Sequence, residues 1–351
     1  MSKSFLRKSL QGFEPYVPGE QPADGEDWIK LNTNESPLPP SPRVIEAIKA
    51  ATDESLRLYP SPTAAPARQA IAKHFGLAPM QVTLGNGADE LIEMCLRAFA
   101  GAGDRVAYPT PTYPLLEPLC RLHDAVPSPN PSGELFTWSP ELMDDPAPLK
   151  FLVNPNSPTG TWHGGPSVER VVKRSKGVVM LDEAYVDFAF ESQVALLAKH
   201  DNLLILRTMS KSYALAGMRI GFALGSPELI AALDAVKDSY NLDRLAIVAA
   251  TAAIQDEEHH RKIVDHVVGE RRWLELQLHE LGFEHSPSEA NFVFVKPTMG
   301  NVGAAVVDAL RQRRILVRYY DRDPIAGWFR ITVGTRVQHE RLLSALKEIL
   351  I

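Results

Sequence analysis

Short apolar runs and longer amphipathic stretches alternate along this sequence. Two of the apolar runs, at residues 178–181 and 203–206, contain only Val, Met, Leu and Ile and have the length of fully buried strands. Polar residues follow both runs, with Asp182 after the first and Thr208 to Lys211 after the second. Because ligands bind at the carboxyl ends of strands in open α/β sheets, we expect Asp182 and Lys211 to converge there.

The same patterns predict the other elements. Strands are expected at 82–84, 104–108 and 151–153, and helices after Ser41-Pro42 and over 91–99. Helices are also expected over 227–236 and, with a long amphipathic pattern, over 259–281. The remaining chain predicts a strand at 292–295, a helix at 302–311, strands at 315–317 and 329–333, and a helix at 342–350. This last alternation is typical of a small α+β domain.

Composition narrows the class of protein. The chain has 351 residues, 45% hydrophobic and 23% charged, which is enough for one large and one small domain with separate cores. A formal charge of -6 gives no sign of a polyanion partner, so we expect no nucleic-acid binding. Cys95 and Cys120 have no spacing for zinc or a disulfide framework, which predicts a reducing cytoplasm and no metal. No run reaches membrane-spanning length, so no membrane association is expected.

Lys211 is the centre of the candidate chemistry. Most single lysines are solvated surface charges, and a buried pairing of Lys211 with Asp182 could equally be an ion pair. Arg219 adds a second cation eight residues after Lys211, and Ser210 adds a hydroxyl. Two cations, a carboxylate and serine hydroxyls suit a ligand that carries an aldehyde, a basic nitrogen and a phosphate, which is pyridoxal phosphate.

Four motifs together carry a resemblance to a known family. They are Asn156-Ser157-Pro158-Thr159-Gly160, Asp182-Glu183-Ala184-Tyr185, Ser210-Lys211 and Ala216-Gly217-Met218-Arg219. With these motifs the sequence resembles the fold-type-I pyridoxal-phosphate aminotransferases, and among them most resembles the histidinol-phosphate aminotransferases. The resemblance runs from about Tyr16 to Arg336.

The resemblance implies an α/β fold with two domains. A large domain over residues 44–240 would hold a mostly parallel seven-stranded sheet flanked by helices and would bind the cofactor. Residues 241–351 would form a small α+β domain, which an N-terminal arm over residues 1–43 would join. The many prolines of the arm and its lack of a period suit an extended segment. A homodimer with shared active sites is also implied.

Catalytic roles follow from the resemblance position by position. Lys211 would bond to the cofactor aldehyde and then act as general base, and Asp182 would keep the pyridine nitrogen protonated.

Three side chains would contact the cofactor ring. Tyr113 would stack on its face. Tyr185 and Asn156 would donate hydrogen bonds to its phenolic oxygen. The commoner family spelling has asparagine where this chain has Ser157, so Ser157 is an alternative donor to Asn156.

The phosphate would lie at a glycine turn that leads into a helix, where free backbone N–H groups and the helix dipole attract anions. Asp89 in this turn would act through its backbone amide or as a helix cap, because a carboxylate repels phosphate. The implied phosphate-side residues are Gly87, Ala88, Asp89, Thr208, Ser210 and Arg219, with Tyr59 reaching in from the neighbouring subunit.

The substrate residues implied are Tyr16 and Asn34 from the arm, and Arg318 and Arg330 near the C-terminus. A planar guanidinium can bind a carboxylate or phosphate through two hydrogen bonds, which suits Arg330 to the substrate's anionic group.

The reaction implied is amino transfer from histidinol phosphate to 2-oxoglutarate, giving imidazole acetol phosphate and glutamate in histidine biosynthesis. Two alternatives use the same scaffold, an aromatic amino-acid aminotransferase and a threonine-phosphate decarboxylase. A non-enzymatic pyridoxal-phosphate sensor is a more remote alternative, because the chain keeps every catalytic position and shows no appended DNA-binding segment.

Overall fold

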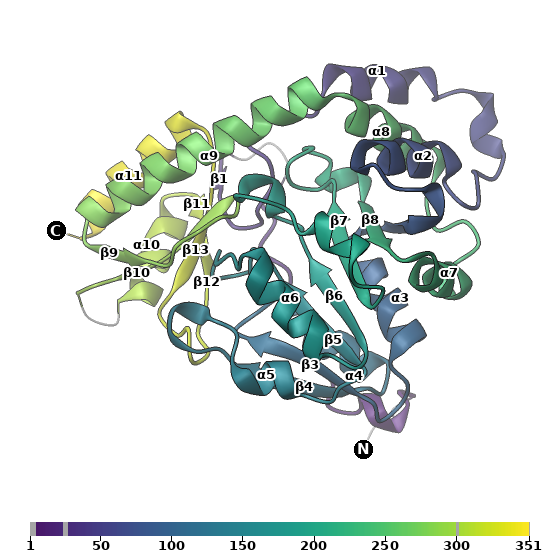
Figure 1. The fold of residues 1–351 in the computed structure, drawn as a ribbon. Helices are drawn as coiled ribbons and strands as arrows, with labels where there is room; N and C mark the ends of the chain where they lie inside the picture. Colours follow the sequence, from purple (N-terminus) through teal and green to yellow (C-terminus); the bar gives the residue numbers. More distant parts are fainter. Residues whose placement is uncertain (1–4, 24–26, 300–301, 351) are drawn as a thin grey trace.

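The computed structural model describes residues 5–23, 27–299 and 302–350 (Figure 1). Its largest element is a seven-stranded sheet with strand order β2-β8-β7-β6-β5-β3-β4. Only β8 runs antiparallel to its neighbours, so the prediction of a mostly parallel seven-stranded sheet is confirmed. The strands are β2 (Val82–Asn86), β3 (Arg105–Thr110), β4 (Val126–Pro131), β5 (Leu149–Val153), β6 (Val178–Asp182), β7 (Leu203–Thr208) and β8 (Ile220–Gly225).

Helices cover both faces of this sheet, which explains the uninterrupted apolar runs of β6 and β7. Val179 and Ile205 pack into the core on one face, while Met180 and Leu204 pack into the core on the other. The helices of this part are α1 (Pro42–Ala50), α2 (Ala65–Phe75), α3 (Gly87–Phe99), α4 (Leu116–Leu122), α5 (Pro140–Asp144), α6 (Gly165–Arg174), α7 (Pro227–Val236) and α8 (Arg244–Gln255).

A second sheet forms the small domain, with order β12-β13-β10-β9 and antiparallel pairing throughout. Its strands are β9 (Phe283–His285), β10 (Phe292–Pro297), β12 (Arg318–Tyr319) and β13 (Phe329–Thr332). Its helices are α9 (Glu257–Glu280), α10 (Gly303–Gln312) and α11 (Arg336–Ile349). Figure 1 shows α9 running from the large-domain helices to the small domain.

The arm is tied to the small domain by a two-stranded parallel pair. β1 (Ile29–Lys30) pairs with β11 (Ile315–Leu316), and Ile29 and Leu31 are buried in the small-domain core. The residues that follow Leu31 are therefore held at a fixed place beside the end of β13, since Thr332 N donates to Leu31 O at 2.9 Å.

Helix α8 shares the core of the large sheet. Its Ala246, Ala250 and Ile254 pack with residues of α1 and α2. We therefore propose that the large domain continues to the end of α8 and that the small domain begins within α9, instead of the expected boundary at residues 240 and 241. None of the helices in the described residues combines the length and the apolar composition that crossing a bilayer requires.

Candidate active site

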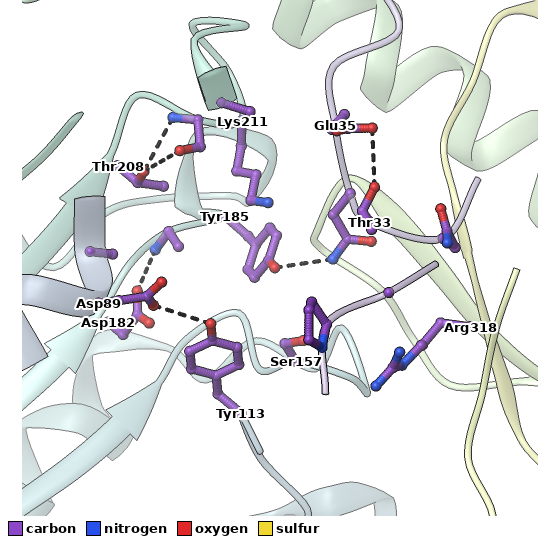
Figure 2. A pocket seen from close by; sticks show the side chains of 18 of the residues that line it. Thr33, Glu35, Asp89, Tyr113, Ser157, Asp182, Tyr185, Thr208, Lys211 and Arg318 are labelled. Atoms are coloured by element: carbon purple, nitrogen blue, oxygen red, sulfur yellow. Dashed lines mark hydrogen bonds between the residues drawn. The ribbon is translucent and has the colours of Figure 1, made fainter. Parts of the chain in front are cut away.

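A cavity of ≈ 430 Å³ opens where the ends of β6 and β7 meet the start of α3, the arm and the small-domain strands (Figure 2). Most of the residues singled out in the sequence line it. These are Tyr16, Asn34, Ala88, Asp89, Tyr113, Asp182, Tyr185, Thr208, Ser210, Lys211, Arg219, Arg318 and Arg330. Gly87, Asn156 and Tyr59 are not among its lining residues.

Lys211 lies in the loop that follows β7 and points into the cavity (Figure 2). Its amine is 5.8 Å from the centre of the Tyr185 ring. Burial lowers the pKa of Lys211 to about 8, and the charge of Arg330 acts in the same direction. A lysine in this state reaches the neutral, nucleophilic amine near physiological pH.

Asp182 is the last residue of β6 and lines the same cavity as Lys211. Its Oδ1 accepts a hydrogen bond from the Ala184 backbone at 2.9 Å. Burial raises the pKa of Asp182 to about 7, and the charges of Asp89 and Glu183 add to this rise. Lys211 opposes the shift but is the weakest of these effects, so a simple ion pair does not account for the two residues. A protonated ring nitrogen would supply the missing positive charge.

Two tyrosines form an aromatic wall. The Tyr113 hydroxyl donates to Asp89 Oδ1 at 3.1 Å, and this bond holds the Tyr113 ring in the wall of the cavity. The Tyr16 ring from the arm meets Tyr113 edge-on, with 6.2 Å between ring centres.

The Arg219 guanidinium lies against the first residue of α3, Gly87. Gly87 has φ +82°, in the left-handed region that favours glycine, and a Cβ there would lie 2.5 Å from Arg219 Nη2. The absent side chain thus leaves room for the guanidinium, which also lies 3.5 Å from Asp89. Thr208 and Ser210 share a hydrogen bond of 3.0 Å on the same side. Backbone N–H groups, hydroxyls and a guanidinium are the kinds of group that bind an anion.

Asn156 and Ser157 have different surroundings, and only Ser157 lines the cavity. The Asn156 amide donates to Pro111 O at 3.0 Å and to Thr159 Oγ1 at 2.9 Å, so both of its donor hydrogens are used by other parts of the protein. Ser157 lines the cavity instead, and its hydroxyl accepts from Arg330 Nη1 at 3.0 Å. We therefore propose Ser157, the expected alternative, and not Asn156, as the side chain that faces the cofactor oxygen.

The arginines enter from the small domain. Arg330 Nη2 donates to Asn32 O at 3.1 Å, while its Nε is buried and has no hydrogen-bond partner within the described part of the chain. Arg318 Nη2 donates to Val17 O of the arm at 3.0 Å. Both guanidiniums retain donors for an anionic ligand.

The arm also contributes Thr33 and Glu35 to the cavity, two neighbours of Asn34 that were not named as site residues. Glu35 pairs with Lys30 at 2.6 Å and accepts from Thr33 Oγ1 at 3.0 Å. Their position directly beside Asn34 is the only sequence signal that pointed to them.

Tyr59 lies on the surface away from the cavity of its own chain. It is 79% exposed, and its ring stacks on Tyr240 with 4.5 Å between centres. Its expected role at a neighbouring subunit stays a prediction.

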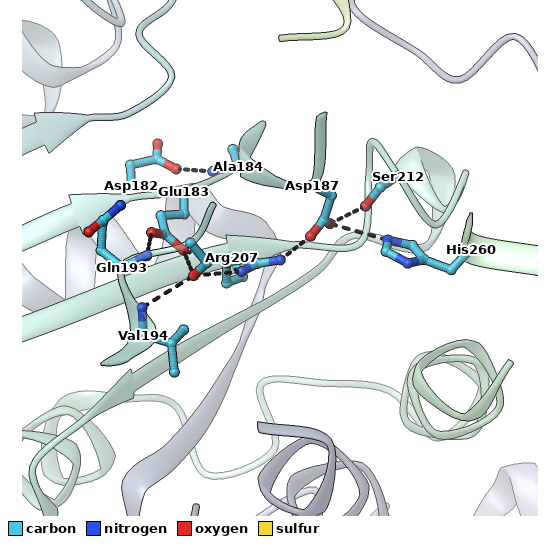
Figure 3. A network of polar contacts seen from close by, with 10 residues as sticks. Asp182, Glu183, Ala184, Asp187, Gln193, Val194, Arg207, Ser212 and His260 are labelled. Atoms are coloured by element: carbon cyan, nitrogen blue, oxygen red, sulfur yellow. Dashed lines mark hydrogen bonds and ion pairs between the residues drawn. The ribbon is translucent and has the colours of Figure 1, made fainter. Parts of the chain in front are cut away.

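A buried polar network lies beside the site (Figure 3). Arg207 donates to Glu183 Oε2 at 3.2 Å and also to Asp187. Asp187 Oδ2 accepts from Ser212 Oγ at 2.5 Å and lies 3.3 Å from His260 of α9. Burial alone would raise the pKa of Asp187, but the combined effect of Arg207, His260 and Ser212 outweighs it and lowers that pKa.

This network fixes the two functional loops relative to each other. Glu183 directly follows Asp182, and Ser212 directly follows Lys211. Glu183 and Asp187 follow β6 and both bond to Arg207 of β7, and Asp187 also accepts from Ser212. These buried contacts connect the loop of Asp182 to the loop of Lys211. Sequence reasoning missed Arg207, since an arginine inside an apolar strand gives no sign of its partners.

Comparison with known proteins agrees with this geometry. The family described as aminotransferase class I and II matches residues 26–346. A histidinol-phosphate aminotransferase from Acetobacter pasteurianus is 45% identical, covering 96% of this chain and 95% of that protein. One from Geotalea uraniireducens is 40% identical, covering 98% and 99%. The crystal structure of histidinol-phosphate aminotransferase from Sinorhizobium meliloti, in complex with pyridoxal-5'-phosphate, matches with a TM-score of 0.87 at 27% identity, covering 92% of this chain and 90% of that one. The chain belongs to the class I and II aminotransferase family.

Proposed function

We propose that the protein transfers the amino group of histidinol phosphate to 2-oxoglutarate, yielding imidazole acetol phosphate and glutamate in histidine biosynthesis. The observation that carries the proposal is that Lys211, Asp182 and Arg219 line one cavity. Burial there lowers the pKa of the Lys211 amine and raises the pKa of the Asp182 carboxyl. The relatives named histidinol-phosphate aminotransferase, 40% and 45% identical over nearly the whole chain, support the choice of substrate.

The enzyme is a pyridoxal-phosphate-dependent transaminase, and the cavity fits that cofactor. The space left by Gly87 beside Arg219, with the start of α3, suits the phosphate. Lys211 can hold the aldehyde carbon, and the Asp182 carboxyl suits a protonated ring nitrogen. When bound, the cofactor supplies an electron sink for the bond that breaks at the substrate's Cα.

The residues of the chain would hold and transfer the protons that the reaction needs near the bound cofactor. Lys211, once released by the incoming amine, would take the proton from the substrate's Cα and deliver it to the cofactor carbon that had carried the aldehyde. Asp182 would keep the ring nitrogen protonated throughout. Tyr113 would cover the ring face, and Tyr185 and Ser157 would face the phenolic oxygen.

Arg330 and Arg318 would bind the substrate's phosphate. Two guanidiniums with free donors lie at one end of the cavity. A doubly charged phosphate can use both of them, whereas a carboxylate needs only one. Tyr16, which lines the same end, would contact the substrate side chain.

The decisive experiment follows the visible absorbance of the bound cofactor. Histidinol phosphate should bleach it, and 2-oxoglutarate should restore it. Much faster turnover of phenylalanine or tyrosine would indicate an aromatic aminotransferase, and carbon dioxide release from threonine phosphate would indicate a decarboxylase. Either result would contradict the substrate assignment while leaving the cofactor assignment intact.

A cytoplasmic homodimer completes the proposal. The composition and the two buried, unpaired cysteines suit a reducing compartment. Tyr59 and its partner Tyr240 form an exposed aromatic surface away from the chain's own cavity, which suits a contact with a second copy of the chain.

A further inference from the structure

The hydroxyl of Tyr185 hydrogen-bonds to Asn34 of the arm and to Ser157, and Asn34 is itself held by the small domain. Asn34 Nδ2 of the arm donates to Tyr185 Oη at 3.0 Å, a bond drawn in Figure 2. Asn34 is in turn bonded to Thr332 at the end of β13. Its backbone N–H donates to Thr332 Oγ1 at 2.9 Å, and its Oδ1 accepts from Thr332 Oγ1 at 3.1 Å. Asn34 is 1% exposed and Thr332 is 3% exposed, so water does not compete for these bonds.

In these contacts the side-chain oxygen of Asn34 faces Thr332 and its NH₂ group faces Tyr185. Thr332 Oγ1 already accepts from the Asn34 backbone, so its own proton is free to donate, and the Asn34 side-chain oxygen receives it. An amide whose oxygen faces Thr332 must present its NH₂ group to Tyr185.

The direction of the amide sets the direction of the Tyr185 proton. A phenol oxygen that accepts a hydrogen bond from an amide has its own proton left to donate elsewhere. Burial raises the pKa of Tyr185, so the hydroxyl keeps that proton at neutral pH. Because the hydroxyl lies at the cavity wall, the proton is available to a ligand in the cavity.

The backbone around Asn34 holds this arrangement in place. Asn34 has φ +55°, a left-handed conformation that asparagine tolerates better than most residues. Asn291, next to β10, donates through Nδ2 to Asn34 O at 3.0 Å. The arm and two segments of the small domain thus fix one side chain of the large domain.

We propose that Asn34 and Thr332 are positioning residues that turn the Tyr185 proton toward the cofactor's phenolic oxygen. This role replaces the direct substrate contact that the sequence implied for Asn34. The inference rests on the proposed function only through the bound cofactor, and it does not depend on which amine is the substrate.

The test titrates the visible absorbance of the lysine-bound cofactor against pH in the full-length holoenzyme. Without a hydrogen bond from Tyr185, the phenolic oxygen holds the proton on the neighbouring Lys211 nitrogen more tightly, and the apparent pKa rises. We expect Thr332→Val and Asn34→Ala to raise it by about half a unit or more, in the same direction as Tyr185→Phe. Thr332→Ser should restore the wild-type value, and Thr298→Val, an exposed threonine of the same domain, serves as control.

A double variant separates positioning from general stability. Tyr185→Phe combined with Thr332→Val should titrate like Tyr185→Phe alone, because residues that act through one hydroxyl are not additive. An unchanged pKa in Thr332→Val, or an additive shift in the double variant, would overturn the inference. If Thr332→Val does not fold, Asn34→Ala carries the same comparison. A wrong substrate assignment would appear only in turnover with histidinol phosphate, so the two failures are distinguishable.

Discussion

Burial gives Asp182 both its chemistry and a cost in stability. With the cofactor absent, the buried carboxyl must lose its proton without a strong cationic partner, which is why its pKa rises from 3.8 to about 7. The folded state therefore binds more protons than the unfolded state between these values, and stability falls as the pH rises through this range. A protonated ring nitrogen beside the carboxyl would offset the cost of ionising it. The ionised carboxylate would then keep the ring nitrogen protonated during catalysis.

Asp182→Asn should separate these two effects. The amide cannot keep the ring nitrogen protonated, so we expect kcat to fall by several orders of magnitude. The cofactor-free variant should be more stable than the wild type near pH 8, by up to about 4 kcal/mol for a shift of about three units, and should show little difference near pH 4. Thermal unfolding of both cofactor-free proteins at the two pH values measures this. Near-normal turnover in the variant would contradict the role of Asp182.

At the scale of elements, the clearest predictions came from strands buried on both faces. Strands β6 and β7 are buried on both faces, so their sequences are continuous apolar runs that are easy to recognise. Asp182 and Lys211, which were expected to converge after these runs, both line the cavity. Strand β4 (Val126–Pro131) was missed because its sequence contains three prolines, which only an edge strand tolerates.

The Asn156–Ser157 pair shows a second limit of sequence reasoning. In an irregular loop, which of two neighbouring side chains faces a cavity depends on backbone turns that no periodic pattern reveals. The Asn156 amide is used by Pro111 and Thr159, and these contacts exist only once the loop is folded. The role of Thr332 could not be predicted from the sequence either, because it depends on hydrogen bonds to Asn34 of the arm that form only in the folded protein.

The start of α3 offers a test with a matched control. Gly87→Ala should weaken cofactor binding about tenfold or more, because a methyl group at φ +82° adds strain of about 1–2 kcal/mol and also meets Arg219. Gly103→Ala has nearly the same φ, +85°, but its Cβ would meet no atom within 4 Å. Both variants should lose similar stability, and only Gly87→Ala should raise the cofactor's dissociation constant. Equal cofactor affinity in the two variants would contradict the role of Gly87 at the phosphate.

At the scale of the whole molecule, the site exists only where three parts of the chain meet. The large domain supplies Lys211 and Asp182, the small domain supplies Arg330, and the arm supplies Asn34. If the proposed homodimer forms, a second chain would add Tyr59, since closed two-fold symmetry makes each subunit give what it receives.

Mixed dimers test that exchange. A heterodimer of Tyr59→Ala and Lys211→Ala would contain one site with both changes and one site with neither. We expect it to recover about half the activity of a wild-type dimer, because each subunit donates Tyr59 across the two-fold axis. Native mass spectrometry confirms the heterodimers, and Tyr59→Ala alone must be clearly impaired. Confirmed heterodimers with no more activity than the parents would show that Tyr59 does not complete the neighbour's site.

The lysine that holds the cofactor can be identified directly. Borohydride reduction of the holoenzyme should fix the cofactor to Lys211 alone, as identified by peptide mass mapping. Lys150, which is fully buried and donates to Met143 O at 2.9 Å, is an internal control that should stay unmodified. Lys211→Ala should bind the cofactor without any covalent label and should have no turnover, since the phosphate and ring contacts come from other residues. A label on another lysine of the wild type, or turnover in Lys211→Ala, would contradict the account.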